Sequence, residues 1–205
     1  MDGIPAASRP RLVFSVLFKT RGLLMAPLVL VMALNFAWEC EVESLNLGLG
    51  LPIFVLGWVT RIWSQGHLKY RLRLPVPELA TSGPYALMRN PVYVGNTMIL
   101  VGLSILCELY WFVPVVLAWC GLVYHFAVVG FEEVRLRKMF GEEYIRYANR
   151  VPRWIPSSLI LQHMPRSSRG PLPAALRAEW QCGLLLLIPI LKELVIEHLP
   201  AISHP

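Results

Sequence analysis

Two short segments of the chain concentrate residue types that could do chemistry. The first covers residues 81–95 and reads TSGPYALMRNPVYVG, with Gly-Pro and Asn-Pro turn signals. Asn90 precedes a proline and is expected to be extended, whereas Pro91 suits the first turn of a helix. Arg89 and Asn90 would then stand beside the free N–H groups of a helix start, which favour an anionic group. The structural alternative is a capped helix start with an arginine that reaches toward lipid headgroups.

The second segment, residues 131–147, reads FEEVRLRKMFGEEYIRY and carries the adjacent acids Glu132 and Glu133. It directly follows a long apolar run, so both carboxylates fall near a membrane boundary, where an unpaired charge is costly. Such an acid is a candidate functional residue. The structural alternative pairs Glu133 with Arg137 one helical turn later, which leaves Glu132 to point elsewhere.

Arg61 is a third candidate, because it lies inside the apolar end of the run 45–63. It either reaches the headgroups or faces its neighbours and holds an anionic group with its fork of N–H donors. The glycines of Gly48-Leu49-Gly50 lack the remaining features of a dinucleotide-binding motif and are expected to allow close helix packing. The four cysteines show no metal-ligand spacing, so no metal site is predicted.

The elements that must position these residues are expected to be membrane helices. Of the 205 residues 56% are hydrophobic and 16% are charged, whereas soluble domains carry about 25% charged residues. Apolar runs cover residues 22–38, 45–63, 92–109 and 112–130. Each run approaches the roughly 20 residues that cross a bilayer. The sequence therefore predicts an all-α integral membrane protein, a bundle of four or at most five transmembrane helices with cytoplasmic connections that bind a cofactor.

The charged residues predict the orientation of this bundle. Most of the 19 Lys and Arg residues precede the first run or follow the second and fourth runs, whereas residues 39–43 carry three glutamates and no basic residue. Basic loops mark the cytoplasmic side of a membrane protein. The N-terminus and both chemistry-bearing segments are therefore expected in the cytoplasm. The net charge of +6 is then a topology signal, and no nucleic-acid partner is predicted.

The chain divides into four predicted regions. They are a cytoplasmic N-terminal segment (1–21), the four-span bundle with the 64–91 cytoplasmic connection (22–130), a cytoplasmic cofactor-binding helix with the segment after it (131–163), and a loop with a C-terminal helix (164–205). Within the last region, residues 172–199 are expected to be helical, but the continuous apolar run 184–191 is too short to span alone. We expect this helix to lie at the membrane interface or to pack on the bundle, with a fifth span as the alternative.

The segments LATSGPYALMRNPVYVGN and EEVRLRKMFGEEYIRYANRVPRWIP together resemble the isoprenylcysteine carboxyl methyltransferase family, which belongs with the membrane phospholipid methyltransferases. The likeness extends from about Gly57 to Pro156. Two motifs in the right order, separated by a helical hairpin of the right length, make it specific. The resemblance implies S-adenosylmethionine as methyl donor, bound at the cytoplasmic edge of the bundle.

By position, the resemblance also implies a set of site residues. Those that would line the donor site are Glu78, Leu79, Ala80, Tyr85, Arg89, Asn90, Pro91, Val92, Tyr93 and Gly95. Glu132 would bind the polar end of the donor, and Arg61 falls where the family carries an arginine near the reacting group. Asn90 stands where the family often has histidine, and it can still form hydrogen bonds.

One departure concerns the substrate. Ala127, Val128 and Val129 stand just before the acidic pair, where the prenylcysteine enzymes tend to carry an arginine. This departure argues against a prenylcysteine carboxylate as substrate. It leaves a lipid amine, another lipophilic acid or a thiol open.

The implied reaction is methyl transfer to a lipophilic substrate that enters from the bilayer, while the donor enters from the cytoplasm. An in-line displacement of this kind depends on alignment and on exclusion of water. A carboxylate or thiolate nucleophile needs no base, whereas an amine needs one, and Glu133 or a water could serve. Membrane lipids are the other expected partners, and nothing in the sequence indicates an oligomeric state.

Two rival interpretations stay open. Membrane sterol reductases share a similar ending and use a nicotinamide cofactor, although they are usually much longer and have more spans. A non-enzymatic membrane scaffold or transporter subunit explains the apolar helices but not the paired motifs.

Overall fold

The computed structural model describes residues 23–36, 46–72, 78–127, 131–155, 176–177 and 179–198, and all regular structure in these ranges is helical. In chain order the elements are η2 (Leu23–Met25), α2 (Ala26–Leu34), the π-helix η3 (Asn46–Gly50), α4 (Leu51–Leu72), α5 (Pro84–Leu87), α6 (Pro91–Leu106), η4 (Tyr110–Phe112), α7 (Val113–Ala127), α8 (Glu133–Phe140), α9 (Glu142–Arg150), η7 (Trp180–Leu186) and α11 (Leu187–His198). The helical fold class is thereby confirmed for the described residues. The predicted N-terminal segment 1–21 and Pro156 lie outside them.

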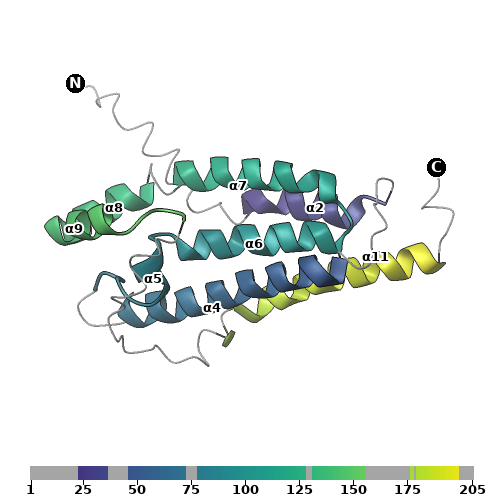
Figure 1. Ribbon diagram of the computed structural model, residues 1–205, viewed down its shortest axis with the longest axis horizontal. Helices are drawn as coiled ribbons and strands as arrows, with labels where there is room; N and C mark the ends of the chain where they lie inside the picture. The colour runs from purple at the N-terminus through teal and green to yellow at the C-terminus, as the bar shows by residue number, and fades with distance from the viewer. Residues whose placement is uncertain are drawn as a thin grey trace, which may run out of the picture.

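Four helices form the body of the molecule, and α6 is its centre. Helices α2, α4, α6 and α7 run side by side along the long axis, while α5, α8 and α9 gather at one end and α11 extends from the other (Figure 1). Met32, Phe54, Leu103 and Val116, one from each of the four helices, are fully buried. The buried core therefore lies along α6, and the predicted cytoplasmic segments meet at the end where α6 begins.

Helices α4 and α6 approach each other closely through glycines. A Cβ atom on Gly57 would lie 2.7 Å from the carbonyl oxygen of Gly95, and one on Gly95 would lie 2.8 Å from that of Gly57. Gly102 repeats this contact one heptad later, where a Cβ would lie 2.5 Å from a backbone nitrogen of α4. Small residues that admit a neighbouring backbone are typical of packed membrane helices. Of the predicted packing glycines, Gly50 lies against the end of α6, where an added Cβ would be 3.0 Å from the Ile105 side chain, whereas Gly48 has no neighbour within 4 Å.

Substituting Gly57→Ala is expected to lower the free energy of unfolding by about 1–3 kcal/mol, because the methyl group must push the two backbones apart. The measurement is thermal or denaturant unfolding of the detergent-solubilised protein. Gly121→Ala is the matched control, since this helical glycine on α7 is exposed and a Cβ atom added to it would meet no neighbour within 4 Å. Equal effects of the two substitutions would show that the α4–α6 contact is not tight.

The exposed surface of the bundle suits a lipid environment. The π-helix η3 and the following α4 together form an apolar stretch, Asn46–Leu68, that is long enough to cross a membrane. Shorter apolar helices cover Leu23–Leu34, Pro91–Leu106 and Tyr110–Phe126. Large apolar side chains such as Leu56 on α4 face outward, more than half exposed. A helix that is apolar on its outer face as well as its inner face is typical of membrane proteins. These features support the helical membrane class, whereas the number of spans stays a prediction.

The helix α4 is longer than predicted. It continues to Leu72, whereas the apolar run ends at Trp63. Polar residues outside a membrane are as compatible with helix as apolar residues inside it, and no proline follows before Pro75. Hydropathy therefore places the apolar part of this helix but not its end.

The C-terminal segment packs on the bundle. The indole Nε1 of Trp58 on α4 donates a hydrogen bond to the carbonyl oxygen of Glu179 at 2.9 Å. Farther along, the buried Nζ of Lys192 donates to the carbonyl oxygen of Cys107 at 3.1 Å, and α11 also contacts α2. The described part of this segment therefore contacts the bundle, whereas its position relative to the membrane stays a prediction.

Candidate active site

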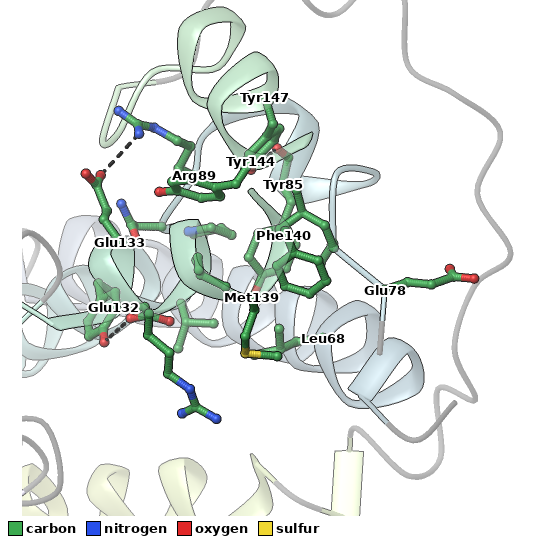
Figure 2. Close-up of a pocket in the computed structure, with 18 of the residues that line it drawn as sticks. Leu68, Glu78, Tyr85, Arg89, Glu132, Glu133, Met139, Phe140, Tyr144 and Tyr147 are labelled. Carbon is green, nitrogen blue, oxygen red and sulfur yellow. Dashed lines mark hydrogen bonds and ion pairs between the residues drawn. The ribbon is translucent and has the colours of Figure 1, made fainter. Parts of the chain in front are cut away.

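A cavity of about 270 Å³ lies where α5, the start of α6, α8 and α9 meet at one end of the bundle. Eleven of the thirteen residues predicted for the site line it, namely Glu78, Leu79, Ala80, Tyr85, Arg89, Asn90, Pro91, Val92, Tyr93, Glu132 and Glu133. We call this space the first cavity. The side chain of Glu78 points away from the other labelled residues (Figure 2). Gly95 and Arg61 do not line the first cavity.

The start of α6 is held in place by the segment after α9. The backbone N–H of Arg89 donates to the carbonyl oxygen of Pro152 at 2.8 Å, and Nδ2 of Asn90 donates to that of Arg153 at 3.3 Å. Asn90 has φ −126° and ψ 51°, outside the helical region as predicted but short of fully extended. Pro91 begins α6, as its missing N–H allows. The two sequence motifs therefore contact each other through one backbone–backbone hydrogen bond and one hydrogen bond from a side chain to the backbone.

The buried carboxylate of Glu133 joins two arginines. It accepts hydrogen bonds from Nε and Nη2 of Arg153 at 2.7 and 3.0 Å. Its Oε1 also lies 3.1 Å from Nη1 of Arg89 (Figure 2). The structure shows this pairing in place of the helical pair with Arg137. A carboxylate whose oxygens are engaged by two guanidinium groups is poorly placed to take a proton. The geometry therefore favours a positioning role for Glu133 over the catalytic role predicted for it.

Glu132 directly precedes α8 and also lines the first cavity. Its Oε2 accepts a hydrogen bond from the hydroxyl of Tyr93 at 2.7 Å. Glu132 and Asn90 thus line one space, although 42 positions separate them in the sequence. The cavity therefore carries a carboxylate that a cationic ligand group can approach.

Aromatic side chains close the cavity on the side of α9. The hydroxyl of Tyr147 donates to the carbonyl oxygen of Tyr85 at 2.7 Å, and the rings of Tyr144 and Tyr147 lie 6.2 Å apart. Burial raises the pKa of both Tyr85 and Tyr147 above the usual tyrosine value, so both hydroxyls stay protonated at neutral pH. Both tyrosines of α9 line the cavity.

Several lining residues were not predicted as site residues. Met139, Phe140 and Tyr144 add apolar surface, and Arg153 reaches the site through Glu133. Phe140 ends α8 and Tyr144 lies on α9, so the turn at Gly141 separates them, and their shared cavity could not be read from helical spacing. Nothing in the sequence connects Arg153 with Glu133.

The two remaining predicted residues lie along α4 and α6. Gly95 contacts the backbone of α4 and so sets the spacing of the two helices. Arg61 lines a second cavity of about 810 Å³ between α2, α4, α6 and the C-terminal segment. Three residues line both cavities, and they are Gln65, Val92 and Tyr93. The second cavity therefore adjoins the first through the start of α6.

The first cavity suits a small ligand with a charged end and an apolar part. Among the described residues, Nε of Arg89 is buried without a hydrogen-bond partner, and a ligand acceptor would satisfy it. Glu132 offers negative charge, while Leu79, Met139 and Phe140 offer apolar surface. Its volume is near the lower end of ligand pockets, roughly 300–1,000 Å³. In the described ranges no three His, Cys, Asp or Glu residues are grouped to hold a metal ion.

A comparison with known protein families supports the class of protein that the two motifs indicate. Residues 45–143 match the family model of the phospholipid methyltransferases. The matched residues make up just under half of the chain, and the match confirms the resemblance drawn from the two motifs.

Three relatives illustrate the likeness. The chain is 35% identical over 115 residues to the cobalt-zinc-cadmium resistance protein CzcN of Cupriavidus metallidurans, covering 56% of this chain and 51% of the relative. It is 33% identical over 118 residues to protein-S-isoprenylcysteine O-methyltransferase B of Arabidopsis thaliana, covering 52% and 57%. To the human protein-S-isoprenylcysteine O-methyltransferase it is 38% identical over 98 residues, covering 44% and 31%.

These matches are partial. The alignments with the first two relatives span about half the length of each relative. No solved structure matches the chain significantly.

Proposed function

We propose that the protein is an S-adenosylmethionine-dependent methyltransferase that acts on a lipophilic substrate held in the membrane. One observation carries the proposal: the matched motif at the start of α6 and the acid Glu132 line one small cavity, which adjoins a larger cavity inside the helical bundle. The relatives named as O-methyltransferases support the same reaction class.

The residues of the first cavity fit the donor by their chemistry. Glu132 offers a carboxylate to the cationic end of the donor, and the hydroxyl of Tyr93 orients that carboxylate. The buried Nε–H of Arg89 can donate a hydrogen bond to a carboxylate of the ligand, while Glu133 keeps the guanidinium in place. Leu79, an apolar residue next to the motif, provides contact area for the nucleoside.

When bound, the donor would supply a methyl carbon on a sulfonium, whose sulfur would leave as an uncharged thioether. The chain contributes alignment, since Val92 and Tyr93 belong to both cavities and fix where the two ligands meet. The aromatic cover of α9 excludes water from the first cavity. Because Glu133 is engaged by arginines, a nucleophile that must lose a proton would transfer it to water and not to Glu133.

The membrane topology is part of the proposal. Four spans, with the N-terminus and the first cavity on the cytoplasmic side, would bring a water-soluble donor and a bilayer substrate to the same point. The basic residues that flank the predicted spans and the outward apolar side chains support this arrangement.

The proposal is tested by incubating the purified protein in lipid nanodiscs with methyl-labelled S-adenosylmethionine and a total lipid extract. Transfer of label into the organic phase is expected, and it should be lost with Glu132→Ala. A parallel incubation replaces the donor with reduced nicotinamide cofactor. Oxidation of the nicotinamide without any transfer of label would overturn the proposal in favour of a reductase.

A further inference from the structure

The second cavity has a single charged residue in its described lining. Arg61 stands among mainly apolar residues such as Val29, Ile99 and Leu185. A lone guanidinium in an apolar cavity would be a strong site for a lipophilic anion, because its attraction is little screened by water. The partners of Arg61 therefore decide what the cavity can bind.

Glu179 neutralises this charge. Nε of Arg61 forms an ion pair with Oε2 of Glu179, and Nη1 of Arg61 donates to Oδ1 of Asn96. Glu179 is 3% exposed and does not line the cavity, so it lies behind the guanidinium. It comes from the C-terminal segment, outside the residues 45–143 that match the family model. The pair is thus a property of this chain that the family match does not cover.

The ion pair between Arg61 and Glu179 changes which ligands the second cavity is expected to bind. With its charge balanced by Glu179, Arg61 offers an incoming anion much less net attraction, while the carboxylate of Glu179 repels that anion. A guanidinium has five N–H donors, so Arg61 can still donate a hydrogen bond to an uncharged oxygen or sulfur. An uncharged ligand end also loses less hydration when it enters an apolar cavity.

We propose that Glu179 is a specificity-determining residue: by neutralising Arg61, it makes the second cavity select lipids with an uncharged nucleophilic end over lipids that end in a carboxylate. This rests on the proposed function, in which the second cavity holds the substrate. Among the substrate classes left open by the sequence, it favours a thiol or a neutral amine over a lipophilic acid.

The test compares two ligands with the same chain, hexadecanol and hexadecanoate, at a pH where the acid is ionised. Native mass spectrometry of the detergent-solubilised protein gives the bound fraction of each without any methyl donor. The wild type is expected to bind hexadecanol about tenfold more tightly than hexadecanoate. Glu179→Gln is expected to raise the affinity for hexadecanoate about tenfold and to leave that for hexadecanol within about twofold.

Two further variants complete the design. Glu193→Gln, an exposed acid on α11, should leave both affinities unchanged. The double variant Arg61→Gln/Glu179→Gln should restore the preference for hexadecanol, because both charges are then absent. Unfolding midpoints report whether each variant folds.

Two results would overturn the proposal. One is equal binding of hexadecanol and hexadecanoate by the wild type, which decides the matter even if Glu179→Gln does not fold. The other is an unchanged preference in a folded Glu179→Gln protein. Because no donor is present, these outcomes are separate from a failure of the proposed methyl transfer, which the assay with labelled donor measures.

Discussion

Replacing Glu132 with alanine is expected to weaken binding of S-adenosylmethionine about 10- to 100-fold, the range of one charge-assisted interaction. Glu132 lines the first cavity, and its carboxylate is oriented by the hydroxyl of Tyr93 at 2.7 Å. In the proposed function it faces the cationic end of the donor. Isothermal titration calorimetry on the detergent-solubilised protein measures the change directly.

Glu142→Ala is the control for this substitution, because Glu142 is an exposed acid on α9 that does not line the cavity. It removes the same charge nearby and should leave the affinity within about twofold, since exposed charges are screened by solvent and salt. The donor affinity of Glu132→Gln should fall between those of Glu132→Ala and Glu142→Ala, because glutamine keeps a hydrogen-bonding oxygen and loses the charge. Equal donor affinity of the wild type and Glu132→Ala would remove Glu132 from the binding site.

The second large effect is expected from Glu133→Ala, which should lower the free energy of unfolding by about 2–4 kcal/mol. Glu133 is buried and joins Arg89, whose side chain is 12% exposed, with Arg153, whose side chain is 36% exposed. Its removal leaves two guanidinium groups without their counter-ion. The partial exposure of Arg153 keeps the effect below the upper end of the range for buried pairs.

The measurement is denaturant unfolding in mixed micelles, with Glu143→Ala as the control. Glu143 is exposed on α9, so its removal should change the free energy of unfolding by less than about 0.5 kcal/mol. If Glu133→Ala were as stable as this control, the three-residue cluster would not hold the two motifs together. In that case Glu133 would again be a candidate base.

The helices themselves could be predicted from the sequence because their signals are local. Apolar runs located α2, α4, α6 and α7, and the Asn90-Pro91 pair marked the first turn of α6. The resemblance of two short motifs also grouped Asn90 with Glu132, residues that the structure brings to one cavity. Local composition and a known motif pair were enough for this part of the site.

The charge pairs could not be predicted because their partners are distant in the chain. Helical spacing favoured Arg137 as the partner of Glu133, whereas the structure pairs Glu133 with Arg153 and Arg89. A pair of exposed residues one turn apart contributes only about 0.2–0.5 kcal/mol, so a buried bidentate contact outweighs it.

The partner of Arg61 could not be predicted from the sequence either. Glu179 lies 118 positions away, in a tail whose position the sequence left open. A charge inside an apolar run signals that a partner exists, but the identity of that partner depends on how the C-terminal segment packs.

The most direct test of the account is an experimentally determined structure of the protein with S-adenosylhomocysteine at saturating concentration. We expect ligand density in the first cavity, with the amino-acid end within hydrogen-bonding reach of Glu132 and Arg89 and the rest of the molecule beside Asn90. Density at another place on the protein, or a clear map of the first cavity without density, would contradict the central claim.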